Sequence, residues 1–226
     1  MNRDPEKRLA AEAAAALVES GMTIGLGTGS TAAFALRRLG ERVRQGLKVR
    51  GVPTSEATRR LAEAEGIALI SFAEVTQLDL TLDGADEFDP DLNLIKGGGG
   101  ALFREKIVAA ASRRLVIFAD SSKRVPQLGA FPLPVEVNPF GWQVTAARIA
   151  ALGADVSLRG GPASPLLTDN HGYVLDCGFG AISDPAALEE QLRAITGVTV
   201  TGLFVGLTDT VLLAEGGRVE TLNVSR

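Results

Sequence analysis

The segment Lys96-Gly-Gly-Gly-Gly-Ala-Leu-Phe-Arg-Glu105 decides how the rest of this 226-residue chain is interpreted. Glycine loses more backbone freedom on folding than any other residue, so four in a row indicate a backbone that needs positive φ or a close approach. Apolar residues recur at helical spacing from Leu102 onward, which predicts that the glycines form a loop opening a helix. A helix start presents free N–H groups and a positive dipole end, which suit a phosphate or carboxylate. We expect an anion site flanked by Lys96 and Glu105; the alternative is a flexible surface turn.

The composition indicates a folded globular protein without general affinity for polyanions. With 46% hydrophobic and 22% charged residues, the chain is able to bury a core in one large or two small domains. Its net charge of -4 and pI near 5.2 argue against a nucleic-acid or membrane-surface binder, because both kinds of binding need a basic face. Any anion site must therefore be local.

The chain has one cysteine, Cys177, and one histidine, His171. A single cysteine forbids an internal disulfide, and the pair is too small a set of soft ligands for zinc. We therefore expect no zinc site and a reducing, cytoplasmic location. The Ala-rich start, Ala10–Val18, contains Glu12 and has no cleavage pattern, so it predicts a packed helix rather than a signal or membrane segment.

A second glycine loop, Gly25-Leu-Gly-Thr-Gly-Ser-Thr31, joins a predicted strand at 23–26 to a predicted helix at 32–45. Its small and hydroxyl residues are able to hydrogen-bond a phosphate or sugar hydroxyls. The third glycine of the dinucleotide fingerprint is missing, and without Gly-Lys-Ser/Thr it is no P-loop. A tight strand-to-helix turn with a Ser or Thr cap is the alternative.

Strands and helices alternate through the first half of the chain. Further strands are predicted at 48–52, 67–70, 78–82 and 114–119. This rhythm predicts a mostly parallel sheet with helices on both faces, which binds ligands outside the carboxyl ends of its strands. Two acidic segments follow such strand ends, Asp83-Gly-Ala-Asp-Glu87 and Asp120-Ser-Ser-Lys123. Asp83 and Asp86 suit proton transfer or sugar binding; the alternatives are turn residues, helix caps or a Mg²⁺ site.

The segment Phe131-Pro-Leu-Pro134 predicts a domain boundary, because two prolines interrupt regular structure. Beyond it the pattern is β-α-β-β-α-β, the ferredoxin-like order, if two short strands at 155–158 and 166–168 form one interrupted element. Asp169-Asn-His-Gly172 is then a hairpin turn, so His171 is a turn residue rather than a catalyst. We predict a Rossmann-like α/β domain at 1–131, completed by a hairpin within 206–226, and a smaller ferredoxin-like α+β domain at 132–205.

Together these motifs, in this order and at these spacings, resemble type A ribose-5-phosphate isomerases. The resemblance also covers Phe131-Pro-Leu-Pro-Val-Glu-Val137, Gly197-Val198 and Gly202-Leu-Phe204, and so runs nearly from end to end. One departure is visible: the family usually has Thr-Asp-Asn-Gly-Asn where this chain has Thr168-Asp-Asn-His-Gly172. The departure concerns a local turn rather than the chemistry.

The resemblance implies interconversion of D-ribose 5-phosphate and D-ribulose 5-phosphate in the pentose phosphate pathway, by a homodimer without metal or organic cofactor. It implies that Glu105 is the base, that Asp83 and Asp86 bind sugar hydroxyls and assist ring opening, and that Lys96 stabilises the enediolate. The remaining residues implied to hold the substrate and its phosphate are Lys7, Thr28, Gly29, Ser30, Thr31, Gly84, Ala85, Gly97, Gly98, Gly99 and Lys123. Two rival functions stay open: another enzyme with a related glycine-loop fold, such as an aminosugar-phosphate deaminase or a CoA transferase, and a non-catalytic sugar-phosphate sensor.

Overall fold

The structure is a computed structural model, and it describes residues 2–224 in two compact units. The first unit runs up to Ala85 and contains Arg104–Arg124 and the chain from Leu207 onward; the second contains Asp86–Phe103 and Val125–Gly206. Units defined by contacts need not be independent folding domains. The limits expected from sequence, 1–131 with 206–226 and 132–205, therefore stay a prediction, which limited proteolysis would test.

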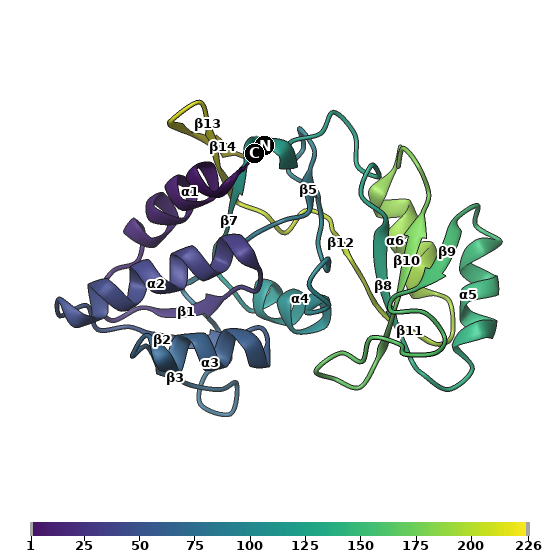
Figure 1. The fold of residues 1–226 in the computed structure, drawn as a ribbon, viewed down its shortest axis with the longest axis horizontal. Coiled ribbons are helices and arrows are strands. Elements are labelled where there is room, and N and C mark those ends of the chain that lie inside the picture. The colour runs from purple at the N-terminus through teal and green to yellow at the C-terminus, as the bar shows by residue number, and fades with distance from the viewer. Residues whose placement is uncertain (1, 225–226) are drawn as a thin grey trace. The chain divides into compact units, whose positions relative to one another are not determined.

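The first unit is built on a seven-stranded sheet (Figure 1). The strands are β1 (Thr23–Leu26), β2 (Arg50–Pro53), β3 (Ala68–Leu69), β4 (Leu80–Asp83), β7 (Leu115–Asp120), β13 (Thr210–Glu215) and β14 (Arg218–Asn223). They lie in the order β14-β13-β7-β4-β1-β2-β3, and every neighbouring pair is parallel except β13 and β14. The predicted mostly parallel α/β sheet is confirmed.

Four helices belong wholly or mainly to this unit: α1 (Asp4–Ala16), α2 (Ser30–Arg44), α3 (Glu56–Ala64) and α4 (Leu102–Ala110). Side chains alternate between the two faces of a strand, and β1 uses this alternation to bind two layers. Ile24 and Leu26 pack in one core cluster with α1, α2 and α3. Gly25 turns the other way, and a Cβ there would lie 2.4 Å from Val108 of α4. The glycine thus lets α4 pack closely on the opposite face.

The path of the chain explains why α4 takes the opposite face. Crossover connections between parallel strands are right-handed. The chain moves through α2 and α3 from β1 toward β3, and through α4 from β4 toward β7, which is the reverse direction across the sheet. The order therefore reverses between β1 and β4, and ligands of such sheets bind outside the carboxyl ends at this point. None of the helices within residues 2–224 is long and apolar enough to cross a bilayer.

The second unit contains a four-stranded antiparallel sheet in the order β11-β8-β10-β9. Its elements are β8 (Leu133–Val137), α5 (Trp142–Ala150), β9 (Asp155–Leu158), β10 (Tyr173–Gly178), α6 (Pro185–Arg193) and β11 (Val198–Thr201). The connectivity is β-α-β-β-α-β with the last strand beside the first, so the ferredoxin-like prediction is confirmed. The strand predicted at 166–168 is wrong, since only an isolated bridge joins Leu167 to Tyr173. The Leu166 N–H instead donates to the carbonyl of Arg159, which folds this segment back as a loop.

The turn predicted at 169–172 is present and explains the position of His171. The residue has φ of 62°, a left-handed conformation that asparagine, aspartate and histidine tolerate better than most side chains. The Thr168 hydroxyl accepts from the N–H groups of Asn170 and Gly172 and donates to Glu136, which closes the turn. His171 is exposed and serves the turn, as expected.

A small three-stranded sheet in the second unit was not predicted. It joins β5 (Glu87–Phe88), β6 (Leu94–Ile95) and β12 (Leu203–Phe204), all antiparallel. Two-residue strands are too short to show alternation in a sequence, so nothing in the pattern indicated them. This sheet fixes the start of the glycine run, because the Lys96 N–H continues it by donating to Gly202.

Candidate active site

The loop after β1 lies directly against the end of β4 at the point of strand-order reversal. The Gly27 N–H donates to the carbonyl of Leu82 at 2.9 Å. A Cβ on Gly27 would lie 2.2 Å from Oδ1 and 2.7 Å from Cα of Asp83, so only glycine fits there. The two predicted loops, 27–31 and 83–85, therefore belong to one place in the first unit.

A set of four hydroxyls, which we name the hydroxyl cluster, fixes the first loop: Thr28, Thr54, Ser55 and Thr58. The Thr28 Oγ1 lies 2.7 to 3.0 Å from the hydroxyl oxygens of the other three. Thr54 and Thr58 in turn donate to the carbonyls of Leu26 and Gly27. The Thr28 hydroxyl is thus already hydrogen-bonded within the protein. Its predicted role in binding substrate stays a prediction.

The N-terminus of α2 follows this loop and has a lysine beside it. The Lys7 Nζ lies 3.2 Å from Oγ of Ser30, the first residue of α2. Ser30 is exposed and Thr31 half-buried. A cation, two hydroxyls and a positive helix end together suit a bound phosphate.

The first turn of α1 is also bonded to the segment after β7. The Glu6 carboxylate accepts from Ser121, which begins the 3₁₀ helix η1 (Ser121–Lys123). These hydrogen bonds, with a smaller contribution from the Arg3 guanidinium, hold the pKa of Glu6 below its ordinary value. Lys123 lies in η1 and Lys7 follows Glu6 in α1, so this contact links the segments that carry both lysines.

Two buried carboxylates of the first unit are candidates for proton transfer. Asp83 ends β4, is 1% exposed, and accepts at 2.8 Å from the N–H of Gly84. Glu105 is 4% exposed and lies in the first turn of α4, where the helix dipole favours a negative charge. Burial of a carboxylate is costly, which makes both groups candidates for a functional role.

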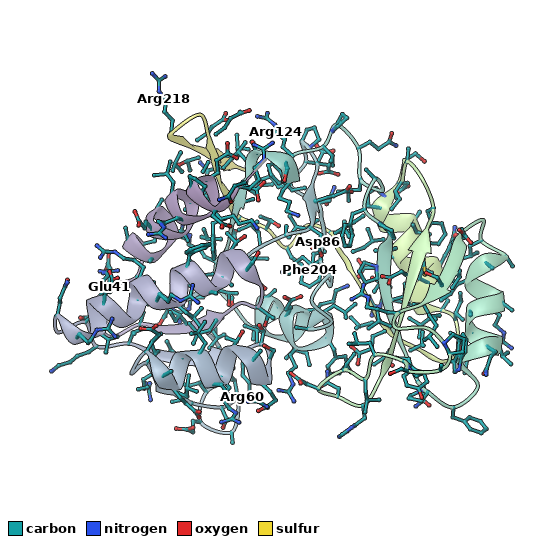
Figure 2. The ribbon with its side chains drawn as sticks, viewed as in Figure 1. Glu41, Arg60, Asp86, Arg124, Phe204 and Arg218 are labelled. Carbon is teal, nitrogen blue, oxygen red and sulfur yellow. The ribbon has the colours of Figure 1, made fainter. Side chains whose placement is uncertain are left out.

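In the second unit, Lys96 and Asp86 lie on either side of the small three-stranded sheet's first hairpin. Lys96 is 3% exposed, and its Nζ lies 5.6 Å from the ring centroid of Phe204, close enough for a cation–π contact. Asp86 Oδ2 accepts from the Gly98 N–H at 2.7 Å. Figure 2 labels Asp86 and Phe204. Asp86 therefore holds the glycine backbone, a contact that sequence reasoning did not foresee.

The four glycines form a turn, which we name the glycine turn (Gly97–Gly100). The Gly100 N–H donates to the Gly97 carbonyl at 2.9 Å, and φ is 104° at Gly97 and 76° at Gly100. Both angles favour glycine. A Cβ on Gly98 would meet Asp86 Oδ1 at 2.6 Å. The prediction of positive φ or a close approach is confirmed: Gly97 and Gly100 have positive φ, and Gly98 lies close to Asp86.

Glu87, which follows Asp86, accepts hydrogen bonds from two backbone N–H groups. Glu87 is 4% exposed, and its two oxygens accept from the N–H groups of Gly129 and Phe131. Within residues 2–224 we find no group of three or more His, Cys, Asp or Glu side chains arranged to hold a metal ion. The Mg²⁺ interpretation of the acidic segment therefore gains no support from the geometry.

The predicted site residues fall into two sets. The first unit contains Lys7, Thr28, Gly29, Ser30, Thr31, Asp83, Gly84, Ala85, Glu105 and Lys123, and the second unit contains Asp86, Lys96, Gly97, Gly98 and Gly99. Sequence reasoning missed the residues that hold these loops in place. They are Glu6, Thr54, Ser55, Thr58, Ser121 and Arg159.

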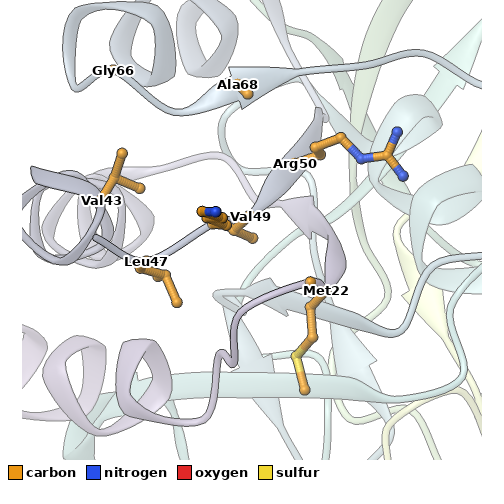
Figure 3. Close-up of a pocket in the computed structure, with 9 residues that line it drawn as sticks. Met22, Val43, Leu47, Val49, Arg50, Gly66 and Ala68 are labelled. Atoms are coloured by element: carbon orange, nitrogen blue, oxygen red, sulfur yellow. The ribbon is translucent and has the colours of Figure 1, made fainter. Parts of the chain in front are cut away.

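A pocket of about 390 Å³ lies elsewhere in the first unit (Figure 3). Met22, Val43, Leu47 and Ala68 line it, together with Arg50, which begins β2. It therefore opens at the amino ends of the strands, whereas the loops of the candidate site follow the carboxyl ends. We do not assign it to the same site.

The chain is similar to known proteins over nearly its whole length. The family model described as "Ribose 5-phosphate isomerase A (phosphoriboisomerase A)" matches residues 50–217. A curated Gloeobacter violaceus protein named "Ribose-5-phosphate isomerase A" is 56% identical over 227 residues, covering 100% of this chain and 99% of the relative. The structure of ribose 5-phosphate isomerase A from Methanocaldococcus jannaschii is 40% identical with a TM-score of 0.93, covering 98% of this chain and all of that one.

A second solved structure holds a ligand. A D-ribose-5-phosphate isomerase in complex with phospho-erythronic acid is 37% identical, covers 99% of this chain and all of its own, and has a TM-score of 0.95. The near-complete coverage and the identities of 37% to 56% agree with the motifs described above. The chain therefore belongs to the ribose 5-phosphate isomerase A family.

Proposed function

We propose that this protein interconverts D-ribose 5-phosphate and D-ribulose 5-phosphate through an enediolate, as a step of the pentose phosphate pathway. The observation that carries the proposal is Glu105, a carboxylate 4% exposed in the first turn of α4, in a chain that matches the family from end to end. Aldose–ketose isomerisation needs one base that moves a proton between C1 and C2. A buried carboxylate five residues after Gly100 in the sequence suits that task.

Four side chains have assigned roles in the reaction. Glu105 takes the proton from C2 of the open-chain aldose and returns it to C1 of the enediolate, while the hydroxyl proton on O2 passes to O1. Asp83 and Asp86 bind sugar hydroxyls and assist opening of the furanose ring, and Lys96 stabilises the negative oxygen of the enediolate. The roles of Asp86, Lys96 and Gly97–Gly99 rest on the family resemblance, which assigns them to the same substrate.

We assign the phosphate to the N-terminus of α2. Support comes from Lys7, whose Nζ lies 3.2 Å from Ser30 Oγ, and from the Glu6–Ser121 contact that links α1 to the segment with Lys123. Backbone N–H groups at residues 29–31 add donors without charge. This assignment leaves the glycine turn for the reacting carbons.

A coupled assay that follows ketose formation from ribose 5-phosphate tests the function. The same preparation is assayed with an aminosugar phosphate and with an acyl-CoA plus a carboxylate acceptor, which separates the rival enzymes. A sugar-phosphate sensor would bind ribose 5-phosphate without turnover and would tolerate loss of Glu105. Absence of isomerase activity in the folded protein would contradict the proposal.

We further propose a homodimer in the cytoplasm, on the family resemblance alone. Sedimentation equilibrium across a tenfold concentration range measures the assembly. Fractionation of the native host locates the protein.

A further inference from the structure

We propose that Arg159 is a positioning residue that fixes the peptide groups of the glycine turn. One guanidinium nitrogen, Nη1, donates to the carbonyl of Gly97 at 2.8 Å and to that of Gly98 at 3.1 Å. Arg159 comes 61 residues after Gly98 in the chain. All of these residues belong to the second unit, so the contact does not depend on any other part of the protein.

Asp176 holds the other side of the same guanidinium. Its Oδ2 accepts from Arg159 Nε at 3.0 Å, and its Oδ1 accepts from Nη2, which makes a two-point ion pair. The side chains are 18% and 24% exposed, so water screens this pair less than a surface pair. The planar fork of arginine is thereby held in one orientation, with Nη1 directed at the two carbonyls.

The backbone of Arg159 is fixed as well. It follows β9, and its N–H donates to the carbonyl of Val174 on β10 while its own carbonyl accepts from Leu166. The side chain therefore extends from a turn whose backbone is bonded to the adjacent strand of the sheet. A positioned side chain on a rigid element holds its target more accurately than one on a loop.

Two side chains share the hydrogen bonds of the glycine turn. Arg159 donates to the carbonyls of Gly97 and Gly98, and Asp86 accepts from the N–H of Gly98. Within residues 2–224 no hydrogen bond uses the N–H of Gly99. Arg159 holds the carbonyl of the Gly98–Gly99 peptide, and Arg159 and Asp86 together hold the preceding Gly97–Gly98 peptide, so the Gly99 N–H is kept in one orientation as a donor for an oxygen of the substrate. This last step rests on the proposed isomerase function.

A run of glycines has no side chains to limit its conformations, so it needs external contacts to stay in one geometry. Loss of Arg159 should release the two carbonyls and let the turn sample other conformations. A misplacement of about 1 Å is enough to lower catalysis about 10²-fold. We therefore expect Arg159→Ala to lose about 10²-fold in kcat/KM, with most of the loss in kcat.

The experiment compares Arg159→Ala, Arg159→Lys and Asp176→Asn with a control, Arg193→Gln, an exposed arginine on α6 of the same unit. Steady-state kinetics and amide hydrogen exchange are measured for each. We expect faster exchange at residues 97–100 in the Ala variant, little recovery with Lys, an intermediate effect with Asn, and no change in the control. A lysine lacks the fork needed to meet Asp176 and two carbonyls together.

Two results would overturn the inference: unchanged kcat/KM in a folded Arg159→Ala protein, or unchanged exchange at the glycine turn. Wild-type kcat/KM and wild-type exchange in Arg159→Lys would also overturn it, because a single positive charge would then be enough to hold the turn. Should Arg159→Ala not fold, Asp176→Asn and Arg159→Lys decide by the same two criteria. Should the wild-type protein lack isomerase activity, the proposed function fails, and amide exchange alone still decides whether Arg159 fixes the turn.

Discussion

The carboxylate of Glu6 accepts two hydrogen bonds from Ser121, one from its backbone N–H at 3.1 Å and one from its Oγ at 2.8 Å. Arg3 completes the contact by donating to the Ser121 Oγ at 2.8 Å and pairing with Glu6 at 3.2 Å. Residues 115 positions apart are thereby joined. The contact sets the first turn of α1, with Lys7, against the segment that contains Lys123.

Glu6→Gln should weaken substrate binding more than it slows chemistry. The neutral amide keeps a weaker bond to Ser121, so we expect KM for ribose 5-phosphate to rise several-fold while kcat changes little. Inorganic phosphate should also inhibit the variant less strongly. The control is Glu41→Gln, which breaks the exposed Arg38–Glu41 pair on α2. A change in kcat with KM constant would contradict a role in binding the phosphate.

The same variant should show a pH-dependent stability difference. Because its folded pKa is lowered, Glu6 stabilises the fold above its unfolded pKa, and this contribution is lost as pH falls through the folded value. At pH 7 the free energy of unfolding should be larger for the wild type than for Glu6→Gln by about 0.5–1.5 kcal/mol, the usual range for one hydrogen bond. Urea denaturation at pH 7 and at about pH 3 measures it. A difference that persists in acid would show that the charge is not the cause.

Glu105→Gln should lose most isomerase activity and stay folded. The amide keeps the shape of the side chain but cannot accept the carbon-bound proton, and a positioned base contributes about 10²–10⁴ in rate. Glu63→Gln is a suitable control, since Glu63 pairs with Arg59 on the exposed face of α3. Turnover at the wild-type rate in the Glu105 variant would remove Glu105 from its proposed role.

Chelators should leave the rate unchanged. The proposed proton transfer uses carboxylates and a lysine, and Glu87 is already bonded to two backbone N–H groups. The measurement is turnover after dialysis against EDTA, compared with turnover after Mg²⁺ is added back. Strong loss that Mg²⁺ restores would favour a metal at the acidic segment.

Gly27→Ala should damage both stability and activity. The new methyl group would meet the backbone of Asp83, which has no room to move within the parallel sheet. Overpacking of this kind costs about 1–3 kcal/mol, and displacement of Asp83 should lower kcat/KM. Gly178→Ala is the matched control, because its Cβ would have no neighbour closer than 3.6 Å. Equal thermal stability in the two variants would contradict the packing argument.

Cys177 should resist thiol reagents in the folded protein. Burial, with a smaller effect of the Asp176 charge, raises the pKa of its thiol to about 12, so almost no thiolate exists at pH 8. Labelling with iodoacetamide followed by intact-mass measurement should show no adduct natively and one adduct in urea. Rapid native labelling would mean that β10 opens locally.

The sequence predicted those features that depend on residues close together in the chain. The alternation of strands and helices predicted the parallel sheet. The run Gly97–Gly100 indicated a constrained backbone because glycine adopts positive φ more readily than other residues. The end of β4 at Asp83 followed from the same pattern. These signals depend on neighbouring residues, so periodicity and residue type are enough to find them.

The contacts that hold the loops were beyond such reasoning. Arg159 reaches Gly97 across 62 residues, and Glu6 reaches Ser121 across 115. Neither arginine nor glutamate has a spacing that marks it as a partner of a distant backbone group. The short strands β5, β6 and β12 were missed for a related reason, since each contains only two residues and pairs with a distant segment.

The position of β13 between β7 and β14 has a consequence for synthesis. Residues 121–209 separate β7 from β13, so at 5–20 residues per second a ribosome needs about 5–20 s to produce the missing neighbour. During that interval the nascent chain carries an apolar strand with an uncovered edge, a template for wrong pairing. A stop codon that removes the final hairpin should therefore yield insoluble aggregates rather than a shortened enzyme.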